Sequence, residues 1–456
     1  MYIDLMSPKK QAKKNNANPR AKKVLIETYG CQMNVADSEV VASILADDGF
    51  ALTDTADNAD VILLNTCSIR ENAEQKIFHR LSHLRHYKKK KSKLVVGILG
   101  CMAERLKKKL IGERDLVSIV VGPDEYRSLP SLVNQAFRGE QGVAVELSKV
   151  ETYEDITPLR TEGVSAWLSI MRGCNNFCAF CVVPYTRGRE RSSGYRSIVE
   201  QSISLYENGV REVTLLGQNV NSYNDTKSGI KFPQLLEGIA KELPDLRIRY
   251  STSHPHDMSD ELIYAHENYK NICNFIHLPV QSGSSKILKK MRRDYTAEKY
   301  LERIEMIRKH LPGVALSTDI IAGYCTETEE DHQLTMDLMK EVRYDGAFMF
   351  KYSERGNTLA QKKYPDDVPE EVKQKRLAEI IEQQRAIAGE INATEVGKTH
   401  EILVEGPSKK KEELWQGRSD TNKMCIFPYN GEKEGDKVTG KVVESNSATL
   451  FVEIES

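Results

Sequence analysis

Residues 174–181 have the sequence Cys174-Asn175-Asn176-Phe177-Cys178-Ala179-Phe180-Cys181. Three cysteines separated by three and then two residues can bind one small inorganic group. Thiolates are soft ligands, which favours either zinc or an iron–sulfur cluster. A structural zinc site requires four protein ligands, and no fourth cysteine or histidine lies nearby at zinc spacing. Three cysteines suit a four-iron cluster whose fourth iron stays open, with zinc or a purely structural role as the alternatives.

This stretch resembles the signature of the radical S-adenosylmethionine (SAM) superfamily, CxxxCxxC with an aromatic residue directly before the last cysteine. Phe180 occupies that aromatic position. The resemblance implies that Cys174, Cys178 and Cys181, the motif trio, hold a 4Fe-4S cluster. It also implies that the open iron chelates the amino and carboxylate groups of SAM.

Length and composition limit the remaining possibilities. A chain of 456 residues is too long for one ordinary core, so we expect two to three domains. A formal net charge of -1 shows no overall bias toward polyanions. Nine cysteines are too sparse for a disulfide scaffold, and their clustering indicates metal chemistry in a reducing, cytoplasmic compartment. No apolar run is long enough for a membrane span. The basic residues 1–21 lack the apolar segment of a secretory signal and are predicted to be a disordered tail, with an RNA-contacting arm as the alternative.

The first predicted domain covers residues 22–142. Its apolar runs alternate with helical stretches, which indicates a parallel sheet buried on both faces. The expected strands are Val24–Glu27, Val61–Leu64 and Leu94–Leu99, and the expected helices are Ser38–Asp47 and Arg70–Lys91. Cys31, Cys67 and Cys101, the auxiliary trio, each come just after one of these strands, so they should open onto one edge of the sheet. Free cysteines are usually small buried residues, but this placement favours a second three-cysteine iron–sulfur cluster.

The residues around the auxiliary trio resemble the amino-terminal domain of the methylthiotransferases, a radical SAM subgroup that carries an auxiliary cluster. The resemblance is carried by Thr28–Asn34, Asn65-Thr66-Cys67 and Gly100-Cys101.

The second predicted domain covers residues 160–394, after a polar linker. Six β-type runs alternate with helices, and the helix Glu370–Ala393 closes the domain. The runs are Ala166–Met171, Val213–Leu216, Leu246–Tyr250, Phe275–Leu278, Val314–Ile321 and Ala347–Tyr352. Six β/α units are too few for a closed eight-stranded barrel. An open (β/α)6 barrel is the radical SAM fold, so the pattern and the motif agree.

Polar residues follow the strands of this barrel, where such a fold builds its site. The candidates for contact with SAM are Phe180, Gln218, Asn219, Ser251, Gln281, Ser282 and Asp319. By position, Gln218 and Asn219 are expected at the methionine end of SAM, and Ser282 and Asp319 near its ribose or carboxylate. Ordinary loop residues or helix caps are the alternative for each. His254 and His277 are expected to be hydrogen-bonded structural histidines.

Residues 397–456 are predicted to form a small all-β barrel of OB-like size. The expected strands are His400–Val404, Met424–Phe427, Asp436–Val443 and Thr449–Ile454. The segment resembles the TRAM domain of RNA-modifying enzymes, particularly at Lys398-Thr399 and Trp415–Arg418. Because it carries slightly more acidic than basic residues, RNA contacts are expected only from local groups, namely Lys409–Lys411, Arg418 and Lys423.

Over residues 22–456 the chain resembles the MiaB-type tRNA methylthiotransferases. The motifs that carry this resemblance are Arg172-Gly173-Cys174, Cys181–Glu190, Leu216–Asn221 and Pro279–Gly283. The resemblance implies methylthiolation of C2 of N6-(dimethylallyl)adenosine beside the tRNA anticodon. It implies two 4Fe-4S clusters and two SAM molecules, one as methyl donor and one as the source of the 5′-deoxyadenosyl radical, with sulfur from the auxiliary cluster. The implied partners are a tRNA anticodon stem-loop and a reducing donor such as flavodoxin or ferredoxin, and the enzyme is expected to be a monomer.

Two other functions remain open at this point. Related enzymes use the same plan on threonylcarbamoyl-adenosine or on a ribosomal-protein aspartate, but the loop Pro184–Glu190 favours the isopentenyl type. A non-catalytic iron–sulfur carrier that binds RNA is the alternative of another class. Gly323–Thr328 departs from the family pattern, which often has Phe-Pro-Gly after the first glycine, and this puts the local loop shape in doubt.

Overall fold

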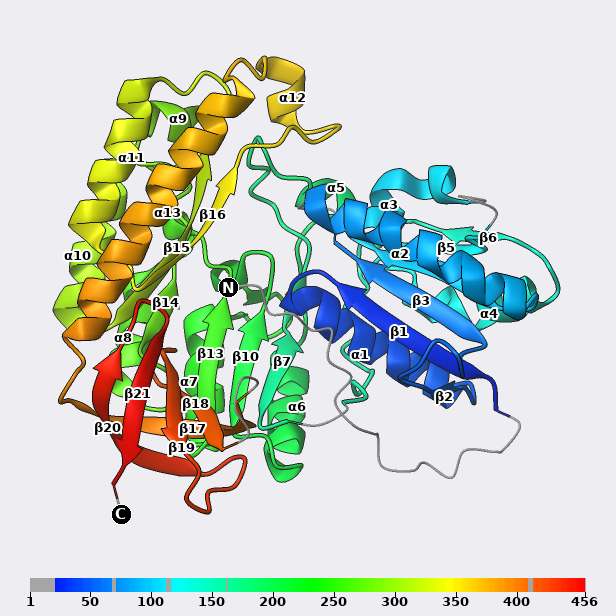
Figure 1. The fold of residues 1–456 in the computed structure, drawn as a ribbon, viewed down its shortest axis with the longest axis horizontal. Helices are drawn as coiled ribbons and strands as arrows, with labels where there is room; N and C mark the ends of the chain where they lie inside the picture. Colours follow the sequence, from blue (N-terminus) through cyan, green and yellow to red (C-terminus); the bar gives the residue numbers. More distant parts are fainter. Residues whose placement is uncertain (1–20, 68–70, 112–115, 161–162, 409–412, 456) are drawn as a thin grey trace. The chain divides into compact units, whose positions relative to one another are not determined.

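The structure is a computed structural model that describes residues 21–67, 71–111, 116–160, 163–408 and 413–455 (Figure 1). The tail predicted at residues 1–21 lies outside these ranges except for its last residue, and Lys409–Lys411 lie outside them entirely. The chain divides into two compact units. Unit 1 contains Met1–Glu162, Ser169–Asn176 and Cys181–Ser197, and unit 2 contains Gly163–Leu168, Phe177–Phe180 and Ile198–Ser456. None of the described helices is long and apolar enough to cross a membrane.

Unit 1 is built on a six-stranded parallel sheet with the order β2-β1-β3-β4-β5-β6. The strands are β1 (Lys23–Tyr29), β2 (Ala51–Leu52), β3 (Val61–Thr66), β4 (Val95–Gly100), β5 (Ile119–Val121) and β6 (Gly142–Ala144). The helices are α1 (Gln32–Asp47), α2 (Glu71–Lys90), α3 (Cys101–Leu106), α4 (Leu129–Phe137) and the short α5 (Val183–Thr186). An antiparallel pair, β8 (Met171–Arg172) and β9 (Arg191–Ser192), completes the unit.

Both faces of the sheet are covered, which explains why its strands are apolar throughout. Ile62 and Leu64 pack with α2 and α3 on one face. Val61 and Leu63 pack with α1 and α4 on the other face. Successive residues of a strand point to opposite faces, so an unbroken apolar run supplies both cores at once. The parallel sheet predicted from the sequence is confirmed.

Unit 2 contains the six predicted parallel strands of the open barrel, as two three-stranded sheets with the orders β13-β10-β7 and β14-β15-β16. A bridge between Ile248 and Ile272 joins β13 to the segment before β14. The strands are β7 (Ser165–Ser169), β10 (Glu212–Leu216), β13 (Arg247–Ser251), β14 (Phe275–His277), β15 (Ala315–Ala322) and β16 (Gly346–Lys351), with a small hairpin of β11 (Asn224–Asp225) and β12 (Ile230–Lys231).

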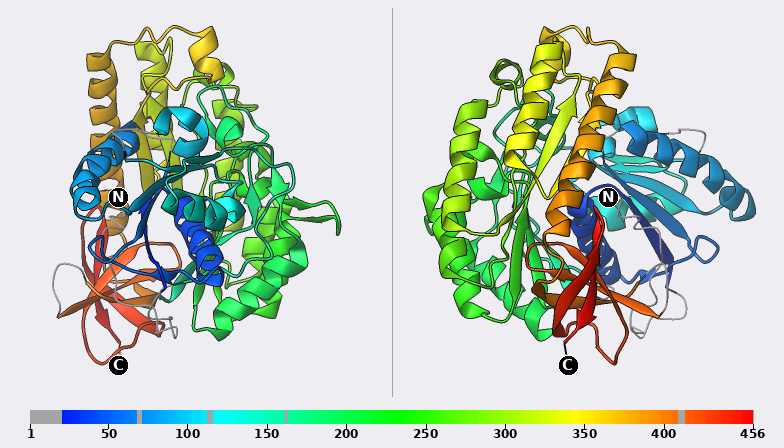
Figure 2. Two further views of the ribbon diagram at one scale, coloured as in Figure 1. Left: turned by 90° about the vertical axis from the view of Figure 1, so that its right-hand side faces the viewer. Right: turned by 60° about the vertical axis from the view of Figure 1, so that its left-hand side comes forward.

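Helices cover the outer side of this barrel (Figures 1 and 2). They are α6 (Tyr195–Glu207), α7 (Phe232–Glu242), α8 (Asp260–Asn268), α9 (Ser285–Lys290), α10 (Ala297–His310), α11 (Glu329–Val342) and α13 (Glu370–Ala393), while the short α12 (Leu359–Lys363) lies beyond the end of β16. The last helix has the bounds predicted from the sequence. It packs beside α11 and along β16, and it leads into the carboxy-terminal barrel.

The carboxy-terminal segment is a closed five-stranded barrel with the order β17-β18-β19-β21-β20. Its strands are β17 (Thr399–Pro407), β18 (Leu414–Ser419), β19 (Met424–Pro428), β20 (Lys437–Ser445) and β21 (Thr449–Ile454). β18 was not among the expected strands. Its sequence contains Gly417, which is required because a Cβ there would lie 2.3 Å from the carbonyl oxygen of Leu403 on the neighbouring strand.

This barrel is fastened within unit 2 by two arginines of β13. Arg247 donates to the carbonyl oxygens of Arg418 and Glu401 at 2.7 and 3.0 Å. Arg249 donates to the carbonyl oxygens of Ser419 and Asp420, each at 2.6 Å. These four acceptors are backbone atoms, so this part of the attachment depends on the course of the chain, and Arg247 adds an ion pair with the carboxylate of Glu401 at 2.9 Å.

Lys423 belongs to the same attachment. Its ammonium group donates to Asp345 and Asn392 at 2.6 and 2.9 Å. Lys423 thus has a structural role, because Asp345 pairs with its charge and Asn392 accepts a hydrogen bond, while its contact with RNA stays a prediction.

Replacing Arg249 should loosen the carboxy-terminal barrel. In Arg249→Ala the buried carboxylate of Glu212, now 2.8 Å from Nε of Arg249, loses its partner. Breaking a buried ion pair in this way costs about 3–5 kcal/mol. Hydrogen exchange of the amides in β17–β21 should therefore accelerate. Arg343→Ala is the control, because it removes only an exposed ion pair with Glu390, worth about 1 kcal/mol or less. Equal protection in the two variants would contradict the attachment described here.

Candidate functional site

The auxiliary trio lies at one edge of the unit 1 sheet. Tyr29 pairs with Thr66 and Thr66 pairs with Gly100 across three adjacent strands. Cys31, Cys67 and Cys101 follow these ends by two, one and one residue. The structure therefore brings the three cysteines together at the carboxyl ends of the strands, as parallel pairing requires.

Cys31 sits directly before α1, which explains why this helix starts at Gln32 and not at Ser38. Cys31 has extended backbone angles and donates its N–H to Oδ1 of Asn34 at 3.3 Å. The side-chain amide of Asn34 donates to Asn65 and to the carbonyl oxygen of Thr66, at 3.2 and 3.3 Å. These bonds fix the first turn of the helix to the end of β3. The pattern of apolar residues predicted a later start because the first turns of α1 contain polar residues.

The thiols of the auxiliary trio interact with one another. A hydrogen bond from Cys67 lowers the pKa of Cys31 to about 6, although burial opposes the shift. Burial raises the pKa of Cys101, and the charge of Arg187 opposes that rise. Among the described residues no three metal-binding side chains converge on a single ion. A 4Fe-4S cluster has no such requirement, because each cysteine binds a different iron, so this donor set suits a cluster better than zinc.

A buried arginine contacts the auxiliary trio. Nε of Arg187 donates to Sγ of Cys101 at 3.2 Å, and Nη2 donates to Oδ2 of Asp37 at 2.7 Å. The other carboxylate oxygen of Asp37 accepts from Arg172 at 2.8 Å. Burial raises the pKa of Asp37. The two guanidinium groups outweigh this effect and hold the pKa below its usual value. Asp37 is therefore ionised and holds two arginines.

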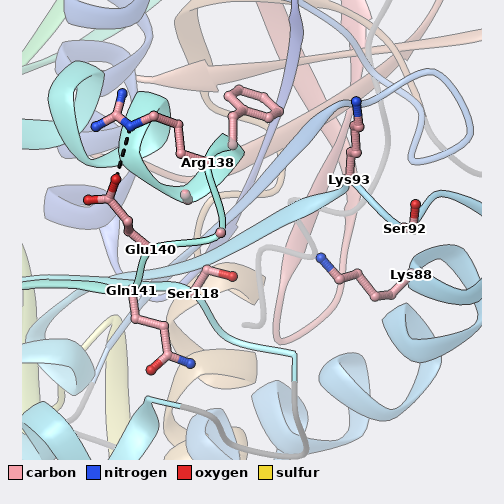
Figure 3. A pocket seen from close by; sticks show the side chains of 10 residues that line it. Lys88, Ser92, Lys93, Ser118, Arg138, Glu140 and Gln141 are labelled. Carbon is pink, nitrogen blue, oxygen red and sulfur yellow. Dashed lines mark hydrogen bonds and ion pairs between the residues drawn. The ribbon is translucent and has the colours of Figure 1, made fainter.

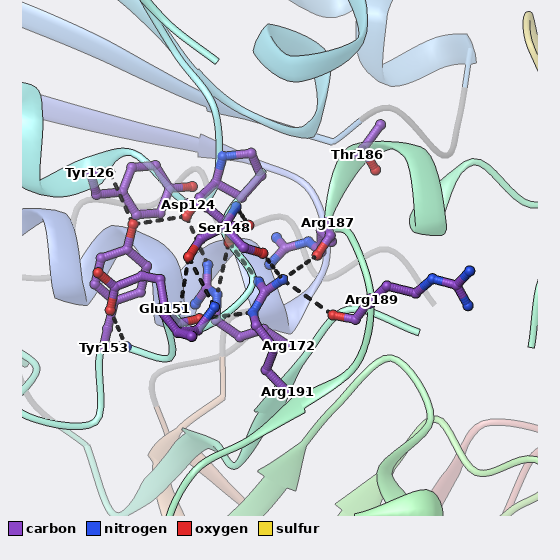
Figure 4. Close-up of polar contacts among 12 residues, drawn as sticks. Asp124, Tyr126, Ser148, Glu151, Tyr153, Arg172, Thr186, Arg187, Arg189 and Arg191 are labelled. Carbon is purple, nitrogen blue, oxygen red and sulfur yellow. Dashed lines mark hydrogen bonds and ion pairs between the residues drawn. The ribbon is translucent and has the colours of Figure 1, made fainter. Parts of the chain in front are cut away.

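The network continues to a second carboxylate (Figure 4). Arg191 donates to Oδ1 of Asp124 at 2.8 Å, and Nε of Arg172 lies 3.8 Å from the same oxygen. The guanidinium of Arg172 also lies over the ring of Tyr153, 4.8 Å from its centroid. Arg172, Arg187 and Arg191 all flank the cysteine motif in sequence, yet they pair with carboxylates of the amino-terminal sheet domain.

The two ends of the cysteine loop are hydrogen-bonded to each other in unit 1. β8 pairs with β9, and the N–H of Cys174 donates to the carbonyl oxygen of Gly188 at 3.1 Å. Gly173 has a φ of +78°, and a Cβ there would lie 2.0 Å from the carbonyl oxygen of Arg189. Only glycine fits between Arg172 and the first cysteine of the motif.

Cys174 and Cys181 belong to unit 1, whereas Cys178 belongs to unit 2. Within unit 2, Nη1 of Arg293 donates to Sγ of Cys178 at 3.5 Å. The neighbouring Ala179 is held by backbone bonds to Met291 and Ala360, each 2.8 Å long. Phe180 packs on the apolar group around Ala179 and Met291. Its aromatic ring therefore anchors the motif in the barrel of unit 2.

Gln218, Asn219 and Ser251 lie where β10 and β13 end. The two following loops are joined by a bond from the N–H of Val220 to the carbonyl oxygen of Thr252 at 3.0 Å. Several buried polar atoms in these loops have no hydrogen-bond partner among the described residues, namely both amide atoms of Gln218, Oδ1 of Asn219, Oγ of Ser253 and Nε2 of His254. Such atoms normally find partners. They fit a polar ligand such as SAM.

Gln281, Ser282 and Asp319 lie on the other half of the barrel. Gln281 has a φ of +73°, and its N–H donates to the carbonyl oxygen of Asp319 at 2.9 Å. Ser282 is fully buried, accepts from the N–H of Ser284 at 3.2 Å and lies 3.4 Å from Oγ1 of Thr335. The hydroxyl of Ser282 is thus already engaged inside the protein.

Two side chains that the sequence pattern gave no reason to select, Arg293 and Tyr295, connect Cys178 to His254 in the loop after β13. Arg293 donates to the hydroxyl of Tyr295 at 2.9 Å, and the ring of Tyr295 packs edge-on against His254. Nδ1 of His254 accepts from the N–H of His256, and burial lowers the pKa of His254 to about 2. His254 is therefore neutral. His277 is hydrogen-bonded to Ser317 at 2.8 Å, so both histidines are hydrogen-bonded as expected, and their purely structural role stays a prediction.

The loop Gly323–Thr328 is anchored in this chain by buried side chains. Tyr324 and Cys325 are fully buried among apolar neighbours. Thr326 has a φ of +63°, in the left-handed region where glycine is favoured.

Unit 1 also contains a hollow, whose lining residues are drawn in Figure 3. Its lining includes Lys88, Lys93, Ser118, Arg138 and Gln141. Three of these come just before β4, β5 and β6, at the amino ends of the parallel strands. Ligands of such sheets bind at the carboxyl ends, so we assign the hollow no part in the site.

Comparison with known proteins agrees with this arrangement. Residues 23–122 match the model described as Uncharacterized protein family UPF0004. Residues 168–339 match the Radical SAM superfamily, and residues 393–454 match the TRAM domain.

A solved structure shares the fold. It is a radical SAM methyltransferase, TsrM, from Kitasatospora setae with cobalamin and a 4Fe-4S cluster bound. The TM-score is 0.55 at 15% identity, over 73% of this chain and 75% of that one. At this identity the likeness shows the fold alone.

Two curated relatives match almost the whole chain. A tRNA-2-methylthio-N(6)-dimethylallyladenosine synthase from Chloroherpeton thalassium is 53% identical, over 94% of this chain and 95% of the relative. A protein of the same name from Phocaeicola vulgatus is 54% identical, over 96% and 97%. The chain therefore belongs to the family of tRNA-2-methylthio-N(6)-dimethylallyladenosine synthases, and it is a radical SAM enzyme.

Proposed function

We propose that this enzyme adds a methylthio group to C2 of N6-(dimethylallyl)adenosine next to the tRNA anticodon. The observation that carries the proposal is the identity of more than half of the aligned residues, over nearly full length, with relatives named for that product. The three cysteines at one sheet edge and the cysteine motif support it, since the C2–H of adenine is neither acidic nor a leaving group. When bound, the clusters and two SAM molecules supply the electron, the 5′-deoxyadenosyl radical, the sulfur and the methyl group.

The chain's own residues bind and orient these groups. The motif trio holds the cluster that binds SAM, and the auxiliary trio holds the second cluster. Gln218 and Asn219 offer unpartnered buried atoms to SAM. Ser251, Gln281 and Asp319 complete its surroundings, while Ser282 acts through its backbone because its hydroxyl is engaged. We assign the auxiliary cluster to residues 22–142, the binding of SAM to residues 160–394 and the contact with RNA to residues 397–456.

The carboxy-terminal barrel contacts the anticodon stem-loop. Trp415 and Tyr429 stack on its surface with ring centroids 4.7 Å apart, and Tyr429 is 52% exposed. Unpaired RNA bases stack on aromatic side chains of this kind. Only the modified base has to leave the loop and enter the barrel of unit 2. We further expect a monomer in the cytoplasm, with flavodoxin or ferredoxin as electron donor.

The number of clusters is tested by iron content. Protein reconstituted without oxygen should hold about eight irons, in two clusters of four. Replacing the motif trio by alanine should leave about four irons, as should replacing the auxiliary trio. The control is Cys273→Ala, because burial raises the pKa of this thiol to about 12 and it belongs to neither trio. Unchanged iron in either triple variant would contradict the assignment, and failure to cleave SAM with dithionite would favour the carrier function.

Substrate choice is tested with matched anticodon stem-loops. The isopentenylated RNA should be methylthiolated about a hundredfold faster than the same RNA without the isopentenyl group. The reason is that burying the apolar prenyl group is worth about 2–3 kcal/mol. The product is measured by mass spectrometry of the digested RNA. Equal rates, or preference for a threonylcarbamoylated RNA, would exclude the isopentenyl assignment.

The aromatic pair is tested by Tyr429→Ala. Loss of one stacked base should weaken binding of the stem-loop by about 1–3 kcal/mol, roughly five- to 150-fold. Reductive cleavage of SAM without RNA should stay unchanged. Tyr264→Ala, which removes another exposed tyrosine of unit 2, is the control and should bind normally. Equal dissociation constants for the two variants by fluorescence anisotropy would rule out the pair as an RNA contact.

A further inference from the structure

Arg187 is placed unlike an ordinary structural arginine. It is only 3% exposed, and two of its nitrogen atoms have partners, Sγ of Cys101 and Oδ2 of Asp37. The third, Nη1, is buried and has no hydrogen-bond partner among the described residues. A buried guanidinium that already touches one thiol and keeps a free donor is suited to an anionic, sulfur-containing ligand.

The surrounding charges leave Arg187 incompletely neutralised. The buried network contains three guanidinium groups, those of Arg172, Arg187 and Arg191, and two carboxylates, those of Asp37 and Asp124. One positive charge is therefore in excess. Arg172 and Arg191 direct their hydrogen bonds to carboxylates and backbone carbonyls. Only Arg187 directs one to a cysteine sulfur, so the excess charge acts on the auxiliary trio.

We propose that Arg187 is a positioning residue of the auxiliary site, which donates N–H groups to sulfur and makes the bound cluster easier to reduce. The inference rests on the proposed auxiliary cluster. Reduction adds one electron, and hence one negative charge, to a cluster held by three thiolates. A buried positive charge and N–H···S bonds stabilise this more negative state, and both raise the reduction potential of a cluster. Asp37 limits the effect by sharing the same guanidinium.

The test uses the full-length chain with Cys174, Cys178 and Cys181 replaced by alanine, so that only the auxiliary cluster is present. The midpoint potential is measured by electron paramagnetic resonance during titration with dithionite. Arg187→Met, which removes the charge and all donors, should lower the potential. Arg187→Lys keeps the charge without the planar fork and should restore part of the loss. Arg191→Met is the matched control, because it removes an arginine of the same network that touches no cysteine.

Asp37→Asn gives the opposite change. It removes a negative charge from the partner of Arg187 and should raise the potential. An unchanged potential in Arg187→Met, or an equal drop in Arg187→Met and Arg191→Met, would overturn the proposal. A drop in both Arg187→Met and Asp37→Asn would do the same, because it would mark the network as purely structural. If Arg187→Met holds no iron, the test rests on Arg187→Lys, and an unchanged potential in that variant would also overturn the proposal. A parent variant without iron would instead contradict the auxiliary cluster itself.

Discussion

The arrangement of the candidate site depends on one buried carboxylate. Asp37 accepts from Arg172 and from Arg187, which lie two residues before Cys174 and six residues after Cys181. A single side chain of α1 thus holds both flanks of the cysteine loop. Removing one partner from a buried group of this kind costs about 3–5 kcal/mol, because the remaining charges lose their compensation. The same contact places Arg187 against Cys101, so one ion pair serves both cysteine trios.

The two trios have different electrostatic surroundings. Arg187 shares its charge with the carboxylate of Asp37. Arg293, beside Cys178, donates to the carbonyl oxygen of Pro279 and the hydroxyl of Tyr295, and forms no ion pair with a carboxylate among the described residues. Hydrogen bonds to sulfur and net charge set the potential of an iron–sulfur cluster. An arginine therefore lies beside each proposed cluster, but in the described part of the chain only the arginine of the auxiliary site is paired with a carboxylate.

The sequence was sufficient for the features that repeat or that lie in contiguous motifs. Apolar runs predicted the parallel sheet of unit 1 and the six strands of the barrel, and the order of strands predicted that Cys31, Cys67 and Cys101 share an edge. Other strands were not predicted, among them β5, β6 and β18. β5 and β6 have only three residues each, and the apolar pattern of β18 is interrupted by Gln416 and Gly417. The partners of Asp37 also escaped. They lie 135 and 150 residues away in sequence, and no local pattern encodes a buried ion pair over such a distance.

The way in which the carboxy-terminal barrel is attached has an evolutionary consequence. Arg247 and Arg249 bind it mostly through backbone carbonyl oxygens, which every residue type provides equally. Mutations on the outer side chains of β18 and β19 therefore leave the joint intact as long as the chain follows the same course. The side chains around Trp415 and Tyr429 can therefore change without loss of these four bonds, provided that Arg247 and Arg249 are kept.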